Sequence, residues 1–327
     1  MKSLVTGGAG FIGSHLVEKL VKKGHSVTVI DNLEVGKLSN LKNIKKKIKI
    51  INADIRNYKK ISNFFKNIDN VYHFAALADI VPSIENPDEY YKTNVSGTYN
   101  VLKASVTHKI KRFIYAASSS CYGIPKNYPT KETEKISPQY PYALTKRLGE
   151  ELVIHFSNIY KLNATSLRFF NVYGPRARTS GTYGAVFGVF LGQKLANKPL
   201  TIVGDGNQTR DFTYIDDVIN AIFAVSKNSK IKSEIFNVGS GKTISINYIS
   251  NLISSKKVYI PKRPGEPDVT FADIKKIKNK IKWKPKIDID RGIKLLFNNI
   301  DQFKDAPVWT PKKIELATKS WFKYLSK

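Results

Sequence analysis

The sequence predicts an α/β protein organised around a doubly wound parallel sheet. Short apolar runs with strand character alternate with stretches of helical periodicity over about the first 170 of its 327 residues. A glycine-rich turn joins the first apolar run to the first helix. Beyond this region strand-like and helical stretches no longer alternate regularly. Short elements interrupted by proline, glycine and lysine follow. We therefore expect a large parallel sheet and a smaller C-terminal α/β domain that binds substrate.

The composition is typical of a globular protein in a reducing compartment. The single cysteine, Cys121, excludes an intramolecular disulfide, and no uninterrupted apolar stretch is long enough to span a bilayer. Glycines interrupt the N-terminal apolar run, so we interpret it as a strand and a turn rather than a signal peptide. We expect a cytoplasmic protein with no membrane partner.

The formal charge of +28 is the most unusual bulk property of the chain. Such a field can recruit nucleic acid or anionic substrates. The basic residues are mostly lysines spread over the chain, without a platform of interleaved basic and aromatic residues. We therefore expect a solvated surface and no nucleic-acid partner. Four of the nine arginines fall in segments expected to line a site: Arg168, Arg176, Arg210 and Arg263.

The N-terminal segment has the pattern of a dinucleotide-binding unit. Gly7, Gly10 and Gly13 lie in a turn where backbone amides can approach a pyrophosphate at the positive end of a helix. Asp31 lies 18 residues past Gly13, where a carboxylate binds the adenosine ribose and repels a 2′-phosphate. This pattern predicts a Rossmann-type fold that binds NAD rather than NADP. The strand, turn, helix and strand are expected at 3–5, 6–13, 15–21 and 26–30.

Polar and small residues follow several of the later predicted strands. Ligands of an open parallel sheet bind outside the carboxyl ends of its strands, and Asp54, Ala75–Leu77 and Ser118–Ser120 lie at such ends. Asp54 is a candidate to contact the adenine, with an ordinary polar loop end as the alternative, and His73 is interpreted as a packed core histidine. Strands are expected at 48–51, 70–74, 113–117, 164–170 and 235–238, and helices at about 87–108, 142–160 and 186–196.

Tyr142 and Lys146 are four residues apart, so on a helix they share one face. A nearby ammonium favours the charged form of a phenol and lowers the tyrosine pKa towards working pH. Such a tyrosine acts as a general base. The spacing alone is more often that of an ordinary amphipathic helix, so its interpretation depends on the rest of the chain.

Five motifs, in their order and spacing, resemble those of the extended short-chain dehydrogenases/reductases, and among these the nucleotide-sugar 4-epimerases. The resemblance covers essentially the whole chain. It implies an NAD-dependent enzyme that epimerises a UDP-sugar at C4 through a transient 4-keto sugar, in the service of polysaccharide biosynthesis. The motifs are the turn 6–13, Asp31-Asn32, the segment 118–123, the pair Tyr142 and Lys146, and the segment 168–176.

The resemblance assigns roles to residues at the matching positions. Tyr142 matches the catalytic base, Ser118 its hydrogen-bonding partner, and Lys146 the lysine that holds the nicotinamide ribose. Arg210 and Arg263 resemble two arginines that clamp the diphosphate, although a surface salt bridge is the alternative for each. The cofactor-binding residues are expected to be Gly7, Gly10, Phe11, Ile12, Gly13, Asp31, Asn32, Asp54, Ile55, Ala75, Ala76, Leu77, Asn94, Tyr142 and Lys146. The substrate-binding residues are expected to be Ser119, Ser120, Asn171, Val186, Val203, Arg210, Arg263 and Thr270, and no metal site is expected.

Several residues of this chain differ from those at matching positions of related enzymes, and these differences restrict the reactions that we expect. The 4,6-dehydratases carry an Asp-Glu pair where this chain has Ser119 and Ser120, so dehydration is disfavoured. Decarboxylating relatives differ over 75–80, and an arginine found near Val81 in some uronate-specific 4-epimerases is absent. Thr270 matches a position that gates sugar size, and a small residue there leaves room for an N-acetyl group. We expect UDP-N-acetylglucosamine and UDP-N-acetylgalactosamine, or UDP-glucose and UDP-galactose, as substrates.

Two alternatives stay open from the sequence. One is another reaction of the same fold on a nucleotide sugar, such as a 4,6-dehydratase, a decarboxylase or another epimerase. The other is a non-catalytic NAD-sensing or RNA-binding protein, which would be expected to lose Tyr142 or Lys146.

The predicted division of the chain has an NAD-binding domain at 1–170, with 210–238 crossing back to it. The nucleotide-sugar-binding domain is expected at 171–209 and 239–327. The relatives implied by the resemblance dimerise through two long helices, here at about 87–108 and 142–160, so we expect a homodimer.

Overall fold

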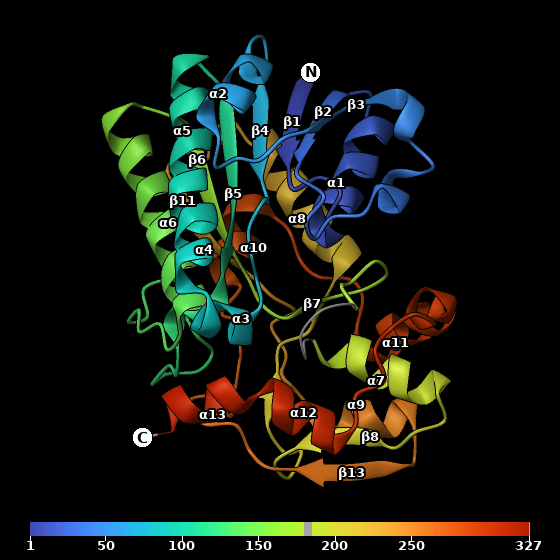
Figure 1. Cartoon of the computed structure of the whole chain (residues 1–327). Helices are drawn as coiled ribbons and strands as arrows, with labels where there is room; N and C mark the ends of the chain where they lie inside the picture. Colours follow the sequence, from blue (N-terminus) through green and yellow to red (C-terminus); the bar gives the residue numbers. More distant parts are fainter. Residues whose placement is uncertain (180–184, 327) are drawn as a thin grey trace.

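A parallel sheet with helices on both faces forms the larger part of the molecule, and a smaller part with short strands lies beyond it (Figure 1). The computed structural model describes residues 1–179 and 185–326. Residues 180–184 and 327 of the predicted second domain lie outside this described part. The predicted fold class is confirmed, and the domain boundaries stay a prediction.

The main sheet has seven strands in the order β11-β6-β5-β4-β1-β2-β3. Every neighbouring pair is parallel. The chain runs outwards from β1 to β3 and then crosses back to β4, so the strand order reverses between β1 and β4. The strands are β1 (Lys2–Thr6), β2 (Ser26–Asp31), β3 (Ile48–Asn52), β4 (Asn70–His73), β5 (Arg112–Ser118), β6 (Ala164–Phe169) and β11 (Glu234–Val238).

Short strands pair in twos in the C-terminal part. The pairs are β10 with β7, β12 with β9, and β13 with β8. Segments between 172 and 210 therefore pair with segments between 213 and 260, which brings separate parts of the chain together. These strands are β7 (Val172–Tyr173), β8 (Leu200–Val203), β9 (Thr209–Arg210), β10 (Thr213–Tyr214), β12 (Ile244–Ser245) and β13 (Lys257–Ile260).

Helices cover both faces of the sheet, as a doubly wound fold requires. In Figure 1, α4, α5 and α6 lie along one side of the sheet, and α1 and α8 lie along the other. The α-helices are α1 (Phe11–Lys22), α2 (Tyr58–Ile61), α3 (Ile80–Glu85), α4 (Pro87–Tyr91), α5 (Thr98–Thr107), α6 (Pro141–Ile159), α7 (Val186–Leu195), α8 (Ile215–Lys227), α9 (Ile246–Ile253), α10 (Lys275–Ile281), α11 (Ile289–Phe297), α12 (Pro311–Ala317) and α13 (Lys319–Leu325). The 3₁₀ helices are η1 (Leu38–Leu41), η2 (Lys45–Lys47), η3 (Ser62–Phe65), η5 (Ser119–Tyr122) and η6 (Ile300–Phe303).

The predicted long helix over 87–108 is interrupted by a π-helical segment, η4 (Lys92–Gly97), between α4 and α5. This widened turn is tightly packed. A Cβ at Gly97 would lie only 2.6 Å from Cδ1 of Ile55. Such segments often occur where a helix must present a side chain to a functional site. Here the widened turn contains Asn94.

His73 is a packed core histidine, as predicted. Its side chain is 1% exposed, with Nδ1 2.7 Å from the Thr6 hydroxyl and Nε2 2.9 Å from the Thr98 hydroxyl. Burial lowers the pKa of His73 to about 3, because the charged ring would be desolvated. The imidazole is therefore neutral near pH 7 and ties β1 and β4 to α5.

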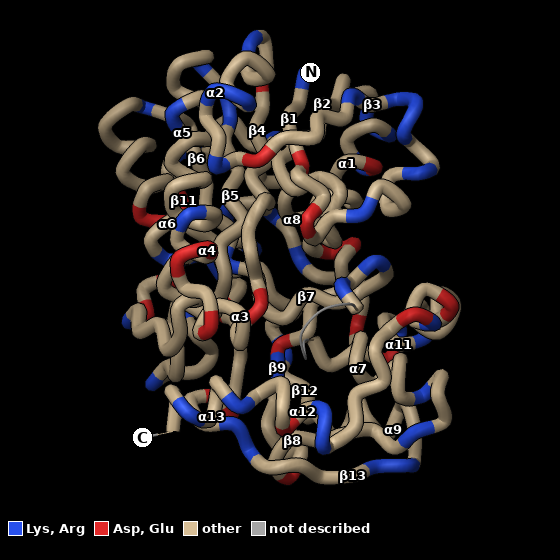
Figure 2. The backbone as a smooth tube through the Cα atoms, in the orientation of Figure 1, with Lys and Arg blue, Asp and Glu red and all other residues tan. Residues whose placement is uncertain are grey.

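Lysines and arginines are spread along the whole tube in Figure 2. Among the described residues, none of the helices combines the length and the apolar character needed to cross a membrane.

Candidate active site

A cleft of about 1170 Å³ lies outside the carboxyl ends of the sheet strands. Its walls come from residues after β1, β2, β3, β4, β5 and β6 on one side and from the C-terminal part on the other. Ligands of doubly wound sheets bind at this place, where the strand order reverses. All the predicted site residues line the cleft except Asn94.

The glycine turn forms a cradle that only residues without a side chain permit. Gly7 has a positive φ of 69°, and a Cβ there would lie 2.6 Å from the backbone nitrogen of Ala75. A Cβ at Gly13 would lie 2.1 Å from the carbonyl oxygen of Gly7. Gly10 caps α1, and its N–H donates to the same carbonyl at 3.1 Å. The first amides of α1 thus face the cleft, and the cradle fits a dinucleotide pyrophosphate.

Asp31 is oriented by the backbone around it. Its two carboxylate oxygens accept hydrogen bonds from the N–H groups of Ala9 and Leu33, each at 2.9 Å. Burial raises the pKa of Asp31, and these two bonds act against that rise. The carboxylate is held at the wall of the cleft, where the sequence predicts the adenosine ribose.

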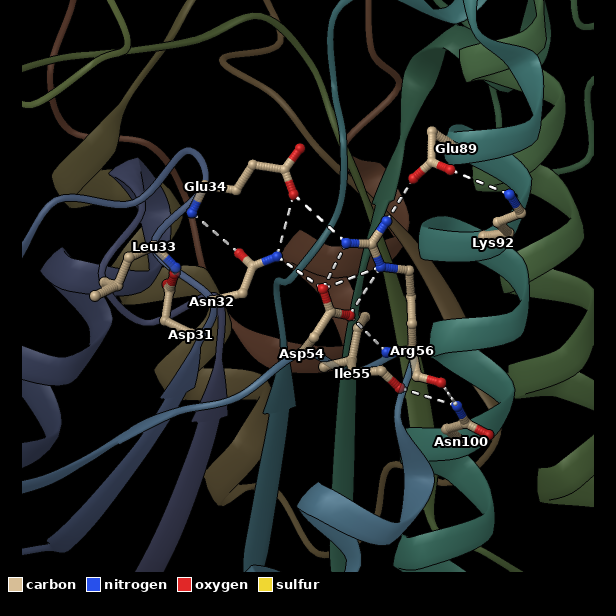
Figure 3. A network of polar contacts seen from close by, with 10 residues as sticks. All are labelled: Asp31, Asn32, Leu33, Glu34, Asp54, Ile55, Arg56, Glu89, Lys92 and Asn100. Atoms are coloured by element: carbon tan, nitrogen blue, oxygen red, sulfur yellow. Dashed lines mark hydrogen bonds and ion pairs between the residues drawn. The ribbon is translucent and has the colours of Figure 1, made fainter.

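A network of charged side chains surrounds Asp54 at the neighbouring part of the cleft (Figure 3). Asp54 accepts hydrogen bonds from Nη2 of Arg56 at 2.6 Å and from Nδ2 of Asn32 at 3.0 Å. Arg56 also pairs with Glu34 and Glu89, which come from different elements. Burial would raise the pKa of Asp54, but the Arg56 hydrogen bonds lower it below its usual value. The sequence did not indicate Arg56, and contact between Asp54 and an adenine stays a prediction.

Ser118, Tyr142 and Lys146 meet at the middle of the cleft. Ser118 ends β5, and the other two residues lie in the first turns of α6. The Ser118 hydroxyl is hydrogen-bonded to the Tyr142 phenol and lies 2.8 Å from the Ser120 hydroxyl. Lys146 is 5% exposed, and its Nζ lies 4.3 Å from the ring centroid of Tyr115. The arrangement places a phenol beside one hydroxyl donor, with the buried Lys146 amine one turn further along α6.

The pKa values of this group differ from the sequence-based expectation. Burial raises the pKa of Tyr142, and the hydrogen bond from Ser118 offsets only part of the rise. Burial also lowers the pKa of Lys146 to about 7, although the charge of Glu150 raises it. The expected lowering of the tyrosine pKa by a firmly charged lysine is therefore wrong for the protein alone. Each group is desolvated by its own burial, and this is the larger cause of both pKa shifts.

Asn94 does not line the cleft, and its predicted contact with the cofactor stays a prediction. It is 1% exposed and uses its side-chain amide to bind the chain around it. It accepts from the N–H of Leu77 at 2.9 Å and donates to the Leu77 carbonyl at 3.0 Å. It also donates to the Thr145 hydroxyl at 3.1 Å. Asn94 thus fixes the lining segment 75–77 against the helix that carries Tyr142.

Arg210 and Arg263 converge on one carboxylate at the other end of the cleft. Nη2 of Arg210 lies 3.1 Å from Oε1 of Glu266, and Nε of Arg263 lies 2.9 Å from Oε2. The two arginines come from β9 and from the segment after β13. Their guanidinium groups are both mostly buried, so a diphosphate bound here would be poorly screened by solvent. Glu266 was not predicted, because an acid three residues after an arginine resembles a surface pair.

Asn171 and Thr270 lie together between the catalytic group and the arginines. Nδ2 of Asn171 donates to the Thr270 hydroxyl at 2.8 Å, and the N–H of Asp211 donates to the same hydroxyl at 3.1 Å. Val203 ends β8 and Val186 begins α7, and both line the cleft. Thr270 is therefore a small side chain whose hydroxyl is already engaged.

Arg168 belongs to one of the segments expected to line a site, but its own side chain does not line the cleft. It is 2% exposed and forms a buried ion pair with Glu150, which is 1% exposed, with Nη2 and Oε2 2.7 Å apart. Ser166 donates to Oε1 of Glu150 at 2.6 Å, and Arg168 donates to the Tyr122 hydroxyl at 2.8 Å. The pair joins β6 to α6, one turn after Lys146. A buried carboxylate on α6 could not be recognised from sequence periodicity alone.

Arg178 and Asp79 form an ion pair across the cleft, and both residues line it. Asp79 precedes α3, which contains Val81, whereas Arg178 follows β7 in the chain. An arginine from another segment therefore pairs with Asp79, two positions before Val81 in the chain. The sequence could not show it, because the two residues are 99 positions apart.

The fold and cleft define a dinucleotide-dependent enzyme with a tyrosine, a lysine and a serine at the reacting centre. The sequence matches the NAD dependent epimerase/dehydratase family over residues 3–239. The chain belongs to this family, whose cofactor is NAD. It is a UDP-sugar 4-epimerase or a related decarboxylase or dehydratase of the extended short-chain dehydrogenases/reductases.

Three comparisons illustrate the likeness. A Methanocaldococcus jannaschii protein provisionally named UDP-glucose 4-epimerase is 39% identical over 90% of this chain and 97% of its own length. UDP-glucuronate 4-epimerase of Thermodesulfobacterium geofontis is 36% identical over 96% of this chain and 97% of its own length. The crystal structure of Thermotoga maritima UDP-glucose 4-epimerase with UDP-glucose has a TM-score of 0.86 at 34% identity, covering 93% of this chain and 99% of that chain.

Proposed function

We propose that this protein interconverts the C4 epimers of a UDP-sugar through a transient 4-keto sugar. The observation that supports this best is the order of parts along one cleft. The glycine cradle lies at one end, Ser118, Tyr142 and Lys146 lie in the middle, and the pair Arg210 and Arg263 lies at the other end. The sugar of a nucleotide sugar held by the arginines would reach the phenol.

Different residues of the chain carry out different parts of this reaction. Tyr142 takes the proton from the C4 hydroxyl, and Ser118 donates a hydrogen bond to the same oxygen. NAD supplies the reversible hydride transfer when it is bound. Arg210 and Arg263 retain the diphosphate while the keto sugar turns over, so the sugar can present its opposite face without leaving the cleft.

Two observations favour epimerisation over elimination of water. The positions after Ser118 are Ser119 and Ser120, which begin the 3₁₀ helix η5 and line the cleft. Neither is an acid or base of the strength that dehydration needs at neutral pH. The Ser120 hydroxyl instead lies 2.8 Å from Ser118, which orients the hydroxyl beside Tyr142.

Thr270 supports an N-acetylated sugar as substrate. It lines the cleft next to Asn171, and its side chain is small for a position that faces the sugar. UDP-N-acetylglucosamine and UDP-N-acetylgalactosamine are therefore the proposed substrate pair, with UDP-glucose and UDP-galactose accepted as well.

We expect Thr270→Tyr to suppress turnover of the N-acetylated substrate selectively. The larger ring would fill the space beside C2 of the sugar, so kcat/KM should fall by roughly 100-fold for the acetylated pair. The value for UDP-glucose should fall by less than about fivefold. Thr270→Ser is the matched control, because it keeps the hydroxyl that Asn171 and Asp211 bind. Equal losses on both substrates would contradict the gating role.

The ion pair between Arg178 and Asp79 favours a second substrate class, the UDP-uronates. A carboxylate at C6 of the sugar would compete with Asp79 for the Arg178 guanidinium, which is bidentate towards carboxylates. The charge of Arg178 also counteracts the burial that raises the pKa of Asp79.

An assay with three UDP-sugars distinguishes these substrates and reactions. The protein is mixed with UDP-glucose, UDP-N-acetylglucosamine or UDP-glucuronate in separate tubes, and the products are identified by NMR. The proposal expects the matching C4 epimer, with the N-acetylated sugar converted fastest. A 4-keto-6-deoxy sugar would instead identify a dehydratase, and a pentose with release of carbon dioxide a decarboxylase.

We also propose that the protein is a cytoplasmic homodimer that serves polysaccharide biosynthesis. Apolar side chains on α4, α5 and α6 support the dimer, because Tyr91, Tyr99, Leu144 and Ile159 are each at least 45% exposed. Two copies of these helices could cover them in a four-helix bundle. Light scattering should give the mass of two chains, about 74 kDa from a chain mass of 36.9 kDa. A mass of one chain would contradict the dimer.

A further inference from the structure

The helix α13 places an indole in the wall of the cleft at its arginine end. Trp321 is 3% exposed and lines the cleft, and its N–H donates to the Pro264 carbonyl at 2.7 Å. The neighbouring Ser320 hydroxyl donates to Glu85 at 2.8 Å, at the end of α3. Figure 1 shows α13 next to α3, below the cleft-bearing end of the sheet. The helix therefore joins the segment after β13 to the opposite wall.

Trp321 contacts Arg263, which belongs to the proposed diphosphate site, and Tyr140, which lies beside the predicted base Tyr142. The guanidinium carbon of Arg263 lies 5.0 Å from the centre of the indole ring, within cation–π range. The ring of Tyr140 lies 6.2 Å from the indole on another side. Tyr140 is in turn parallel to Tyr142 within 8°, with ring centroids 6.4 Å apart. One side chain thus connects the predicted diphosphate arginine with the flank of the predicted base.

We propose that Trp321 is a positioning residue for substrate, which holds Arg263 ready for the diphosphate and keeps Tyr140 beside Tyr142. This inference rests on the proposed function. The indole occupies the face of the guanidinium, whereas Nη2 at its edge donates to Oε1 of Glu266 at 3.3 Å. A diphosphate would replace that carboxylate while the Arg263 side chain keeps its rotamer. Such preorganisation lowers the entropy cost of binding.

Trp321 lies at the opposite end of the cleft from the predicted NAD site, so its effect on substrate binding can be measured separately from NAD binding. The glycine cradle and Asp31 belong to the β1–β2 region, whereas Trp321 contacts Arg263, Pro264 and Tyr140 at the opposite end. A residue that only filled the core would affect both ligands through general loosening. A positioning residue should affect UDP and UDP-sugar binding and leave NAD binding unchanged.

The test compares Trp321→Phe and Trp321→Leu with Tyr324→Ala, a control in the same helix whose side chain is 61% exposed. Calorimetry measures the Kd of UDP with NAD present and the Kd of NAD alone, and steady-state kinetics measure KM and kcat for the UDP-sugar. We expect Trp321→Leu to raise the UDP Kd and the KM by roughly tenfold, because it removes the cation–π contact. Trp321→Phe keeps a ring and should raise them by roughly threefold, and the control should match the wild type.

The outcomes distinguish this inference from the proposed function. If wild-type protein with NAD does not bind UDP, the proposed function itself is overturned, and the inference with it. If the wild type binds UDP and Trp321→Leu binds it within twofold as tightly, only the role of Trp321 is overturned. A parallel loss of NAD affinity in Trp321→Leu would likewise reduce Trp321 to a packing residue.

Discussion

Tyr142→Phe is expected to abolish turnover while NAD binding stays intact. The substitution removes only the hydroxyl that is hydrogen-bonded to Ser118 and that would take the sugar proton. A positioned general base contributes about 10²–10⁴-fold to a rate, so kcat should fall by roughly 10³-fold or more. The ring stays in place, and the glycine cradle lies elsewhere in the cleft, so the Kd of NAD should change by less than about twofold.

Two measurements check this expectation. NMR follows conversion of the UDP-sugar over hours, and calorimetry measures NAD binding to the same preparation. Tyr160→Phe is the matched control, because Tyr160 caps the far end of the same helix and is 53% exposed. Epimerisation by Tyr142→Phe at more than about a tenth of the wild-type rate would refute the assigned base.

Arg168→Met is expected to lower the free energy of unfolding by about 3–5 kcal/mol, which is typical when one member of a buried ion pair is removed. The change would leave Glu150, which is 1% exposed, with the hydrogen bond from Ser166 and the ion pair with Arg147 as its compensation. It would also remove the donor to the Tyr122 hydroxyl.

Urea denaturation measures this loss directly through the midpoint and the slope of the transition. The double variant Arg168→Met with Glu150→Gln should recover part of the stability, because no buried charge is then left unpaired. Lys92→Met is the control for an exposed ion pair, since Lys92 pairs with Glu89 at the surface, and it should change stability by less than about 1 kcal/mol. A loss below about 1 kcal/mol in Arg168→Met would contradict a structural role for the pair.

The sequence was sufficient for the fold class, and the predicted site residues other than Asn94 all line the cleft. Local chemistry explains this success. Gly7 and Gly13 occupy positions where any Cβ would collide with backbone, in the turn that joins β1 to α1. The spacing of Tyr142 and Lys146 likewise places them in adjacent turns of one helix. Such features depend on neighbours in the chain and can be recognised without tertiary information.

Two side-chain arrangements at the site could not be read from the sequence, and they have a common physical origin. The amide of Asn94, a predicted cofactor contact, binds Leu77 and Thr145. Arg168 belongs to a segment expected to line the site, but its side chain pairs with a buried carboxylate one turn after Lys146. In each case the direction and partners of a side chain were decided by segments far away in sequence. Motif spacing carries no information about those partners.

The electrostatics of the catalytic group were also decided by tertiary structure. The distance between Tyr142 and Lys146 along the helix suggested an ammonium that lowers the tyrosine pKa. Burial of Lys146 over the Tyr115 ring lowers its pKa to about 7, and burial of Tyr142 raises that of the phenol. Desolvation depends on the number of atoms around a charge, which no local pattern reports.

The sequence by itself thus determined a parallel α/β sheet, an NAD cradle and a tyrosine–lysine pair, because short-range sterics and helical spacing encode them. Only the tertiary structure showed that Glu266 joins the two arginines, that Arg178 reaches Asp79 near Val81, and that Trp321 closes the arginine end of the cleft. These contacts join segments that lie far apart in the chain. They arise when the C-terminal part packs against the carboxyl ends of the sheet.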